Sequence, residues 1–224
     1  MRSVIAIDGP AGSGKSTVSR LLAKHLGYFY LDTGAMYRAV ALRSAREGLD
    51  ISDETALKRL CENLDLQFRL KDGENRTYLG NEDVSAAIRS PEMDGLSSRL
   101  SALKQVRETM RELQRKLGSE GRVVAEGRDM GTVVFPEAEF KFFLTADLKI
   151  RAERRYRERM MRGEPVTLEN VEREMIERDE QDMNRIHSPL RPAHDAVPID
   201  TSCLTPEQVM KVMLEKIGKG YSET

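Results

Sequence analysis

The sequence contains no tryptophan and only two cysteines, Cys61 and Cys203. Two cysteines so far apart make neither a metal-ligand spacing nor a disulfide framework, which favours a reducing compartment. Long apolar runs are missing too, since none approaches the ~20 residues that a membrane-spanning helix needs. An apolar segment begins at Val4, too early for a secretory signal. We therefore expect a cytoplasmic protein without a membrane anchor.

An excess of charge of either sign is also missing. The 36 lysines and arginines face 37 aspartates and glutamates, so the formal net charge is -1 although 33% of the residues are charged. A general polyanion binder normally has a basic excess, so we expect no nucleic-acid partner. At 224 residues the chain is long enough for one domain with an insert, and nothing in it indicates an obligate oligomer. We expect a monomer.

A glycine-rich segment follows the first apolar run and matches the phosphate-loop pattern G-x-x-x-x-G-K-[ST]. The β-branched run from Val4 to Ile7 predicts a buried strand before it, and helical spacing of apolar residues predicts a helix after it. A glycine-rich turn could match by chance, but the flanking strand and helix disfavour that alternative. The predicted triphosphate site consists of Gly9, Pro10, Ala11, Gly12, Ser13, Gly14, Lys15, Ser16 and Thr17.

Each part of this segment has a chemical role. Glycines let successive backbone N–H groups turn inward around phosphates, at the N-terminus of the following helix. Lys15 is a point charge for the β- and γ-phosphates, and the Ser16 hydroxyl can join the shell of a Mg²⁺ ion. The segment predicts triphosphate binding but leaves the phosphoryl acceptor open.

The remaining apolar segments predict an α/β fold. Segments 28–31, 122–125, 140–144 and 196–200 read as strands that alternate with helices, which indicates a five-stranded parallel sheet covered on both faces. Pro198 limits the last strand to an edge or a strand end. Residues 66–70 alternate apolar and polar instead, as in a half-exposed antiparallel strand. We expect a core of residues 1–64 and 118–224, with an insert at about 65–117.

An arginine-rich stretch occupies the region from Lys149 to Arg191. The first helix predicted in this stretch has few apolar residues along one face. It is therefore either a solvated helix with Glu–Arg pairs or a mobile lid over a phosphate site. The phosphate loop upstream favours a lid at about residues 151–170.

Further charged residues follow the second and third strands. Arg38 comes shortly after one strand, and Arg128 and Asp129 directly follow the next. Ligands of open α/β sheets bind at these carboxyl ends, and phosphoryl transfer needs positive charge there. A helix-surface arginine and a structural ion pair are the alternatives. Farther along, Arg178, Asp182 and Arg185 are spaced to share one helix face, and this spacing alone does not decide between a salt-bridge ladder and a site.

Four segments together resemble the bacterial cytidylate kinase family, in order and over nearly the whole chain. They are GPAGSGKST at 9–17, LDTGAMYR at 31–38, EGRDMGTVVFP at 126–136 and RDEQDMNR at 178–185, which is followed by Ser188-Pro189-Leu190. The third segment is highly specific, whereas many NTPases share the first. The resemblance implies a P-loop three-layer nucleoside monophosphate kinase with an NMP-binding insert and an Arg-rich lid. It would transfer a phosphoryl group from ATP to CMP or dCMP with Mg²⁺.

The resemblance also implies roles for individual residues. Thr33, Tyr37, Arg38 and Arg128 would bind the monophosphate, while Ser98, Arg107, Asp129 and Arg185 would read the cytosine. Arg178 and Asp182 would hold the sugar hydroxyls, and Arg151, Arg154 and Arg155 match the lid arginines that act with Lys15 in catalysis. Two departures are Glu126, where some relatives have aspartate, and Thr33, where others have serine.

A geometric condition accompanies the cytosine assignment. Ser98 and Arg107 are nine residues apart, which is roughly 180° around one continuous helix. Both can reach one base only if the helical tract is interrupted between them. We predict an interruption near Leu103.

Other nucleotide-dependent functions fit the sequence less well. A GTPase switch needs an Asn-Lys-x-Asp motif for guanine, which the sequence lacks. A nucleic-acid-dependent ATPase is disfavoured by the near-neutral charge. Another P-loop kinase, acting on a metabolite, is the closest rival, and the insert and the arginine set speak against it.

Overall fold

The computed structural model describes residues 3–71 and 74–222. Contacts divide the chain into two compact units, one formed by Met1–Leu31 with Glu120–Thr224 and the other by Asp32–Ser119. The second unit includes residues 32–64 in addition to the predicted insert at 65–117. The predicted domain limits stay a prediction.

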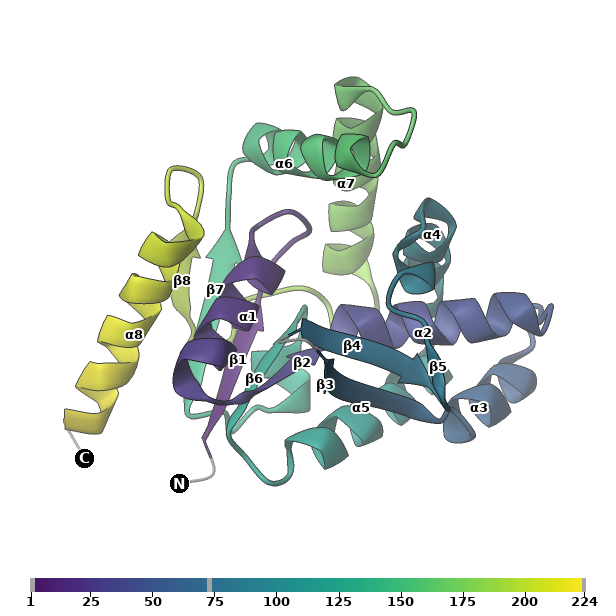
Figure 1. The fold of residues 1–224 in the computed structure, drawn as a ribbon, viewed down its shortest axis with the longest axis horizontal. Helices are drawn as coiled ribbons and strands as arrows, with labels where there is room; N and C mark the ends of the chain where they lie inside the picture. Colours follow the sequence, from purple (N-terminus) through teal and green to yellow (C-terminus); the bar gives the residue numbers. More distant parts are fainter. Residues whose placement is uncertain (1–2, 72–73, 223–224) are drawn as a thin grey trace. The chain divides into compact units, whose positions relative to one another are not determined.

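The first unit is built on a five-stranded sheet in the order β2-β6-β1-β7-β8 (Figure 1). β1 is parallel to β6 and β7, and β7 is parallel to β8, so the predicted parallel α/β sheet is confirmed. β8 lies at the edge, where Pro198 costs no ladder hydrogen bond. The elements are β1 (Val4–Asp8), α1 (Lys15–Leu26), β2 (Phe29–Asp32), β6 (Val123–Gly127), the π-helical turn η2 (Met130–Val134), β7 (Phe140–Thr145), α6 (Leu148–Met161), α7 (Leu168–Asn184), β8 (Val197–Asp200) and α8 (Pro206–Ser222).

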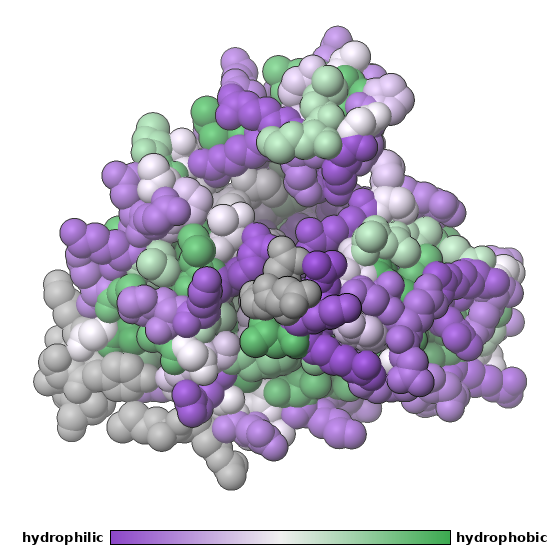
Figure 2. Space-filling view, viewed as in Figure 1, coloured by the Kyte–Doolittle hydropathy of each residue, from purple (hydrophilic) through white to green (hydrophobic). Residues whose placement is uncertain are grey.

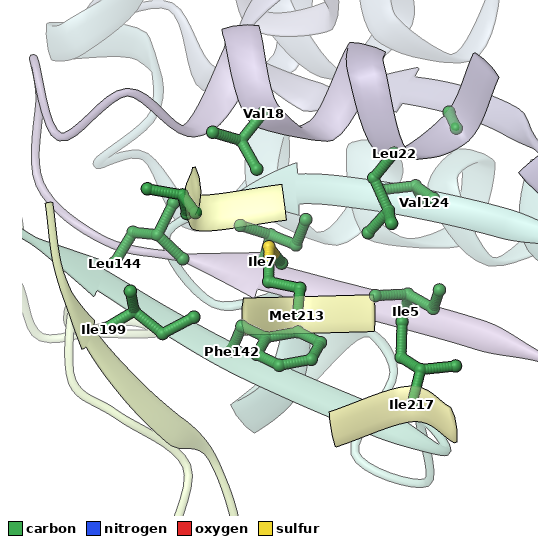
Figure 3. Packing of buried hydrophobic residues seen from close by; sticks show 12 residues of the cluster. Ile5, Ile7, Val18, Leu22, Val124, Phe142, Leu144, Ile199, Met213 and Ile217 are labelled. Atoms are coloured by element: carbon green, nitrogen blue, oxygen red, sulfur yellow. The ribbon is translucent and has the colours of Figure 1, made fainter. Parts of the chain in front are cut away.

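The core of this unit lies between the sheet and two helices. Ile5 and Ile7 are two residues apart in β1, so their side chains point to the same face of the sheet. α1 and α8 cover that face, and Figure 3 shows Val18 and Met213 packing over it. Each fully buried aliphatic side chain contributes about 1.5–3 kcal/mol to folding. This packing fixes β1, and with it the loop that follows.

α1 begins and ends at glycines. Gly14 precedes the helix with φ 84°, and no side chain caps the first turn. Gly27 ends it in the left-handed region, where its N–H donates to the carbonyls of Ala23 and Lys24. The first-turn N–H groups, without a side-chain cap, are available to an anion.

The second unit contains helices and a small sheet. Its three strands run in the order β3-β4-β5 and pair antiparallel, as predicted from the alternating pattern. The elements are α2 (Thr33–Arg46), α3 (Glu54–Glu62), β3 (Leu66–Lys71), β4 (Glu74–Leu79), β5 (Glu82–Asp83), the 3₁₀ turn η1 (Ala87–Arg89), α4 (Pro91–Leu100) and α5 (Lys104–Gly118).

The predicted interruption near Leu103 is confirmed. α4 ends at Leu100 and α5 begins at Lys104, with Leu103 in an extended conformation at φ -78° and ψ 129°. Ser98 and Arg107 therefore lie on different helices of this unit. The geometric condition for a shared ligand is met.

Thr33 is not the cap of α2, although a hydroxyl there fits the usual preference. The Asp32 carboxylate instead accepts the hydrogen bond from the Ala35 N–H, 2.8 Å away. Asp32 is the last residue of β2 and keeps extended backbone angles, as an N-cap requires, whereas Thr33 is already helical.

Figure 2 shows hydrophilic residues over much of one face of the molecule, with apolar residues interspersed over α6 and α7. Met161 is 84% exposed at the end of α6, and Ile186 is 91% exposed just after α7. Within the described residues, no helix is both long and apolar enough to cross a bilayer.

Candidate active site

The phosphate loop between β1 and α1 depends on glycine at its first position. Gly9 has φ +150°, and a Cβ placed there would stand 2.0 Å from the Leu144 carbonyl oxygen. Gly12 and Gly14 also have positive φ, at +71° and +84°. The loop therefore follows a path that only glycine adopts without strain, close to the backbone of β7.

Four consecutive loop carbonyls each accept a hydrogen bond from a side chain. Carbonyls that are held by hydrogen bonds fix the orientation of the peptide groups, and so of the N–H groups that form a phosphate nest. The donors come from α1, α6 and the residue after β8, so distant segments set the loop geometry. The pairs are Lys15 Nζ to Pro10 O at 2.6 Å, Arg151 Nη1 to Ala11 O at 3.2 Å, Arg154 Nη1 to Gly12 O at 3.5 Å and Thr201 Oγ1 to Ser13 O at 3.0 Å.

Lys15 is the buried cation of the loop, with 6% of the residue exposed. Its amine also lies 3.4 Å from the Ser13 hydroxyl. Burial lowers the pKa of Lys15 to about 7, and the nearby positive charge of Arg128 adds to the shift. An anion beside this amine would stabilise its charged form, so the site favours a negatively charged ligand.

Asp8 connects the end of β1 to the segment after β6. Its two carboxylate oxygens accept from the backbone N–H groups of Met130 and Gly131, at 2.8 and 2.7 Å. These donors begin the turn η2, directly after Arg128 and Asp129 in the chain. Burial raises the pKa of Asp8 to about 6 despite both hydrogen bonds. Asp8 thereby holds the segment that carries two of the predicted site residues.

The raised pKa of Asp8 predicts a defined pH dependence of stability. Folding raises this pKa from 3.8 to about 6, so its contribution is complete below about pH 4 and is lost as the pH rises through 6. Asp8→Asn removes that titration. Between pH 4 and pH 7 the unfolding free energy of the variant should gain about 2 kcal/mol relative to the original protein, measured by urea unfolding.

Asp195→Asn is the control, because the Lys141 hydrogen bond lowers the pKa of Asp195 and gives the opposite sign. Parallel pH curves for the original protein and Asp8→Asn would contradict the assignment.

A buried cluster of arginines and carboxylates forms at the ends of β6 and α7. Arg128 Nε lies 2.8 Å from Asp182 Oδ2, and Arg185 lies 3.4 Å from Asp182 and 3.9 Å from Asp129. Burial raises the pKa of Asp182, but the charges of Arg128, Arg178 and Arg185 outweigh it and hold that pKa below its usual range. Asp182 is therefore more than a member of an intrahelical ladder, since its shortest ion pair comes from another element.

Arg185 lies at the C-terminal cap of α7, and its ion pair with Asp182 is consistent with the helix face predicted from its spacing. α7 ends at Asn184, and Arg185 is already extended with ψ 142°. Its Nε donates to the Ser188 carbonyl at 2.6 Å, where the chain turns. Arg185 still reaches Asp182, but from the turn that follows the helix.

The second unit holds the other predicted acceptor residues. Arg38 lies 3.6 Å from Asp32 and 4.0 Å from Asp94, and its buried Nε makes no hydrogen bond to the described residues. Arg107 lies over the Tyr37 ring, 5.7 Å from the centroid. Two hydroxyl residues complete the predicted set of this unit, a buried Thr33 and a half-buried Ser98.

The three predicted lid arginines differ in their surroundings. Arg154 donates to the Thr201 carbonyl at 2.7 Å as well as to the loop, whereas Arg155 pairs with Glu158 along the surface of α6. Arg151 is buried and pairs with Asp179. Sequence reasoning missed Asp179 and Thr201; Thr201 could have been found, because it directly follows the carboxyl end of β8.

Ser16 is the candidate magnesium ligand. It is the second residue of α1, and its side chain is exposed. One hydroxyl oxygen beside a phosphate nest fits Mg²⁺, which keeps most of its shell as waters and phosphate oxygens.

Comparison with known proteins places this chain in a family. A family model described as Cytidylate kinase matches residues 5–219. The cytidylate kinase of Citrifermentans bemidjiense is 52% identical over 211 residues, 94% of this chain and 90% of that protein. The cytidylate kinase of Syntrophotalea carbinolica is 51% identical over 216 residues, 96% of this chain and 92% of that protein. A solved structure of an uncharacterized protein from Eubacterium ventriosum shares the fold at a TM-score of 0.52 and 13% identity, covering 98% of this chain and 99% of that one. The chain belongs to the cytidylate kinase family.

Proposed function

We propose that this chain transfers the γ-phosphoryl group of ATP to CMP or dCMP, giving ADP and CDP or dCDP. The observation that carries the proposal is the buried cluster in which Asp182 pairs with Arg128 and Arg185, in the same unit as the phosphate loop. A simple NTPase needs the loop alone. A set of buried arginines and carboxylates provides the charge and directional hydrogen bonds that a nucleotide acceptor requires.

The phosphate loop holds the donor in this proposal. Its backbone N–H groups and the Lys15 amine bind the β- and γ-phosphates, and the amine stabilises charge that develops on the transferring oxygens. Arg154 and Arg155 supply further positive charge from α6. No side chain acts as a strong general base, because transfer between phosphates depends on alignment and charge.

The phosphate of the acceptor has its own set of residues. In the second unit, Thr33, Tyr37 and Arg38 bind the phosphate of the monophosphate, and the buried Arg38 Nε is a donor suited to it. Arg128 is also assigned to the acceptor phosphate.

The base and the sugar have separate sets of residues. Asp129 accepts from the cytosine amino group, while Ser98, Arg107 and Arg185 donate to its carbonyl and ring nitrogen. Arg178 and Asp182 bind the sugar hydroxyls. The lowered pKa of Asp182 keeps this carboxylate ionised as an acceptor at neutral pH.

ATP is used together with Mg²⁺, which the Ser16 hydroxyl helps to hold and which supplies charge neutralisation at the phosphates. The predicted monomeric state and cytoplasmic location belong to the same proposal. The scarcity of cysteine supports a reducing compartment.

A coupled ADP-release assay tests the function. With ATP and Mg²⁺, CMP and dCMP should give at least about tenfold higher kcat/KM than UMP or AMP, because the buried donors and acceptors match the cytosine edge. Equal rates with CMP and AMP would overturn the proposal. Turnover of a non-nucleotide acceptor alone would favour the rival metabolite kinase.

A further inference from the structure

Arg151 is surrounded differently from the other arginines of α6. It lies in the first turn of the helix and is 7% exposed. Its Nε donates to the Ala146 carbonyl at 2.9 Å, and its Nη1 donates to the Ala11 carbonyl at 3.2 Å and to Asp179 Oδ2 at 2.5 Å. One guanidinium thus contacts the start of its own helix, the phosphate loop and α7.

Asp179 extends this connection along α7. It is 7% exposed and lies three residues before Asp182 on the same helix. Its negative charge also raises the pKa of Arg128. Met175, one turn earlier in α7, comes within 3.1 Å of the position that a Cβ on Gly12 would take, and Arg151 comes within 3.0 Å of it. Arg151, Asp179 and Met175 therefore pack α7 against the middle of the phosphate loop.

These contacts are costly to exchange for a phosphate. To reach a transferring phosphoryl group, the guanidinium would have to leave Ala11 and Asp179. That move would leave the Asp179 carboxylate buried without its ion-pair partner, which is strongly unfavourable. Arg155 faces no such obstacle, because its pair with Glu158 lies on the surface of α6.

We propose that Arg151 and Asp179 are a positioning pair that holds the Ala11 carbonyl outward, and with it the N–H groups of the phosphate loop inward, in the geometry that binds ATP. Arg151 is then not a catalytic lid arginine. Because Asp179 belongs to α7, the pair also ties the loop to the helix that carries Arg178 and Asp182. The inference rests on the proposed function only in taking ATP as the ligand of the loop.

The test compares three variants of the full chain: Arg151→Met, Asp179→Asn and the double variant. Removing both partners leaves no uncompensated buried charge, so the double variant should fold even if a single variant does not. Dissociation constants for ATP are measured by calorimetry without any acceptor, and kcat and KM are measured separately. Arg157→Met is the matched control, because Arg157 lies on the same helix in an exposed pair with Glu153.

A positioning pair acts as one unit. Each variant should weaken ATP binding by about tenfold or more, and the double variant should be no weaker than the single variants beyond about threefold. Arg157→Met should bind ATP within about twofold of the original protein.

Two results would overturn the proposal. In one, the double variant keeps the original affinity for ATP. In the other, Arg151→Met lowers kcat at unchanged ATP affinity while Asp179→Asn changes neither, as expected of an arginine that contacts the reacting phosphate. If CMP proves not to be the acceptor, the ATP-binding measurements still decide the matter, since they contain no acceptor.

Discussion

Lys15→Met should lower kcat/KM for phosphoryl transfer by roughly 10³-fold. The Lys15 amine is the cation inside the phosphate loop, and methionine fills a similar volume without charge. Burial already lowers the pKa of Lys15 to about 7, so the surrounding residues do not favour its charge. Removing the charge should therefore leave the unfolding free energy unchanged or raise it. A coupled assay and urea unfolding on the same preparation separate the two effects.

Lys24→Met is the matched control for this prediction. Lys24 lies in the last turn of the same helix and is exposed. Its replacement should change kcat/KM by less than about twofold. A Lys15→Met protein that retains a tenth or more of the original kcat/KM would refute the role given to the amine.

Gly9→Ala should nearly abolish activity and destabilise the first unit. A Cβ at this position would stand 2.0 Å from the Leu144 carbonyl oxygen, a backbone atom that cannot rotate away. The φ of +150° adds strain for any residue with a side chain. Displacing the loop should cost about 3 kcal/mol of stability and lower kcat/KM at least about 100-fold, because the N–H groups lose their alignment.

Gly48→Ala separates strain from collision. Gly48 also has a positive φ, at +62°, but nothing lies within 4 Å of the position of an added Cβ. Its replacement should cost about 1 kcal/mol and leave kcat unchanged. If Gly9→Ala were no more harmful than Gly48→Ala, the close approach of the loop to β7 would not matter for function.

Several features were predictable because they depend on short segments. The β-branched run before Gly9 and the helical spacing after it predict the strand, loop and helix that the structure contains. The α4–α5 break was predictable for another reason: the resemblance required Ser98 and Arg107 to serve one base, and a continuous helix cannot place them so. Pro198 likewise indicated an edge strand, since it lacks a backbone donor.

Local preference does not decide between two neighbouring residues that can both cap a helix. Both Asp32 and Thr33 are good helix caps. The choice fell to Asp32 because β2 extends to that residue, and the extent of a strand depends on its partners in the sheet. The end of α7 at Asn184 was not predicted either, although Arg185 at the cap still pairs with Asp182.

The sequence by itself determined that this chain folds as an α/β protein with a triphosphate loop, because pattern and loop chemistry are properties of consecutive residues. Only the tertiary structure decided which residues hold the backbone of the loop in place. The donors to the Ala11 and Ser13 carbonyls lie 140 and 188 residues away along the chain. The Asp8 carboxylate meets the segment after β6 across more than 120 residues. Such contacts follow from which strands are neighbours in the sheet, and no spacing along the chain encodes that order.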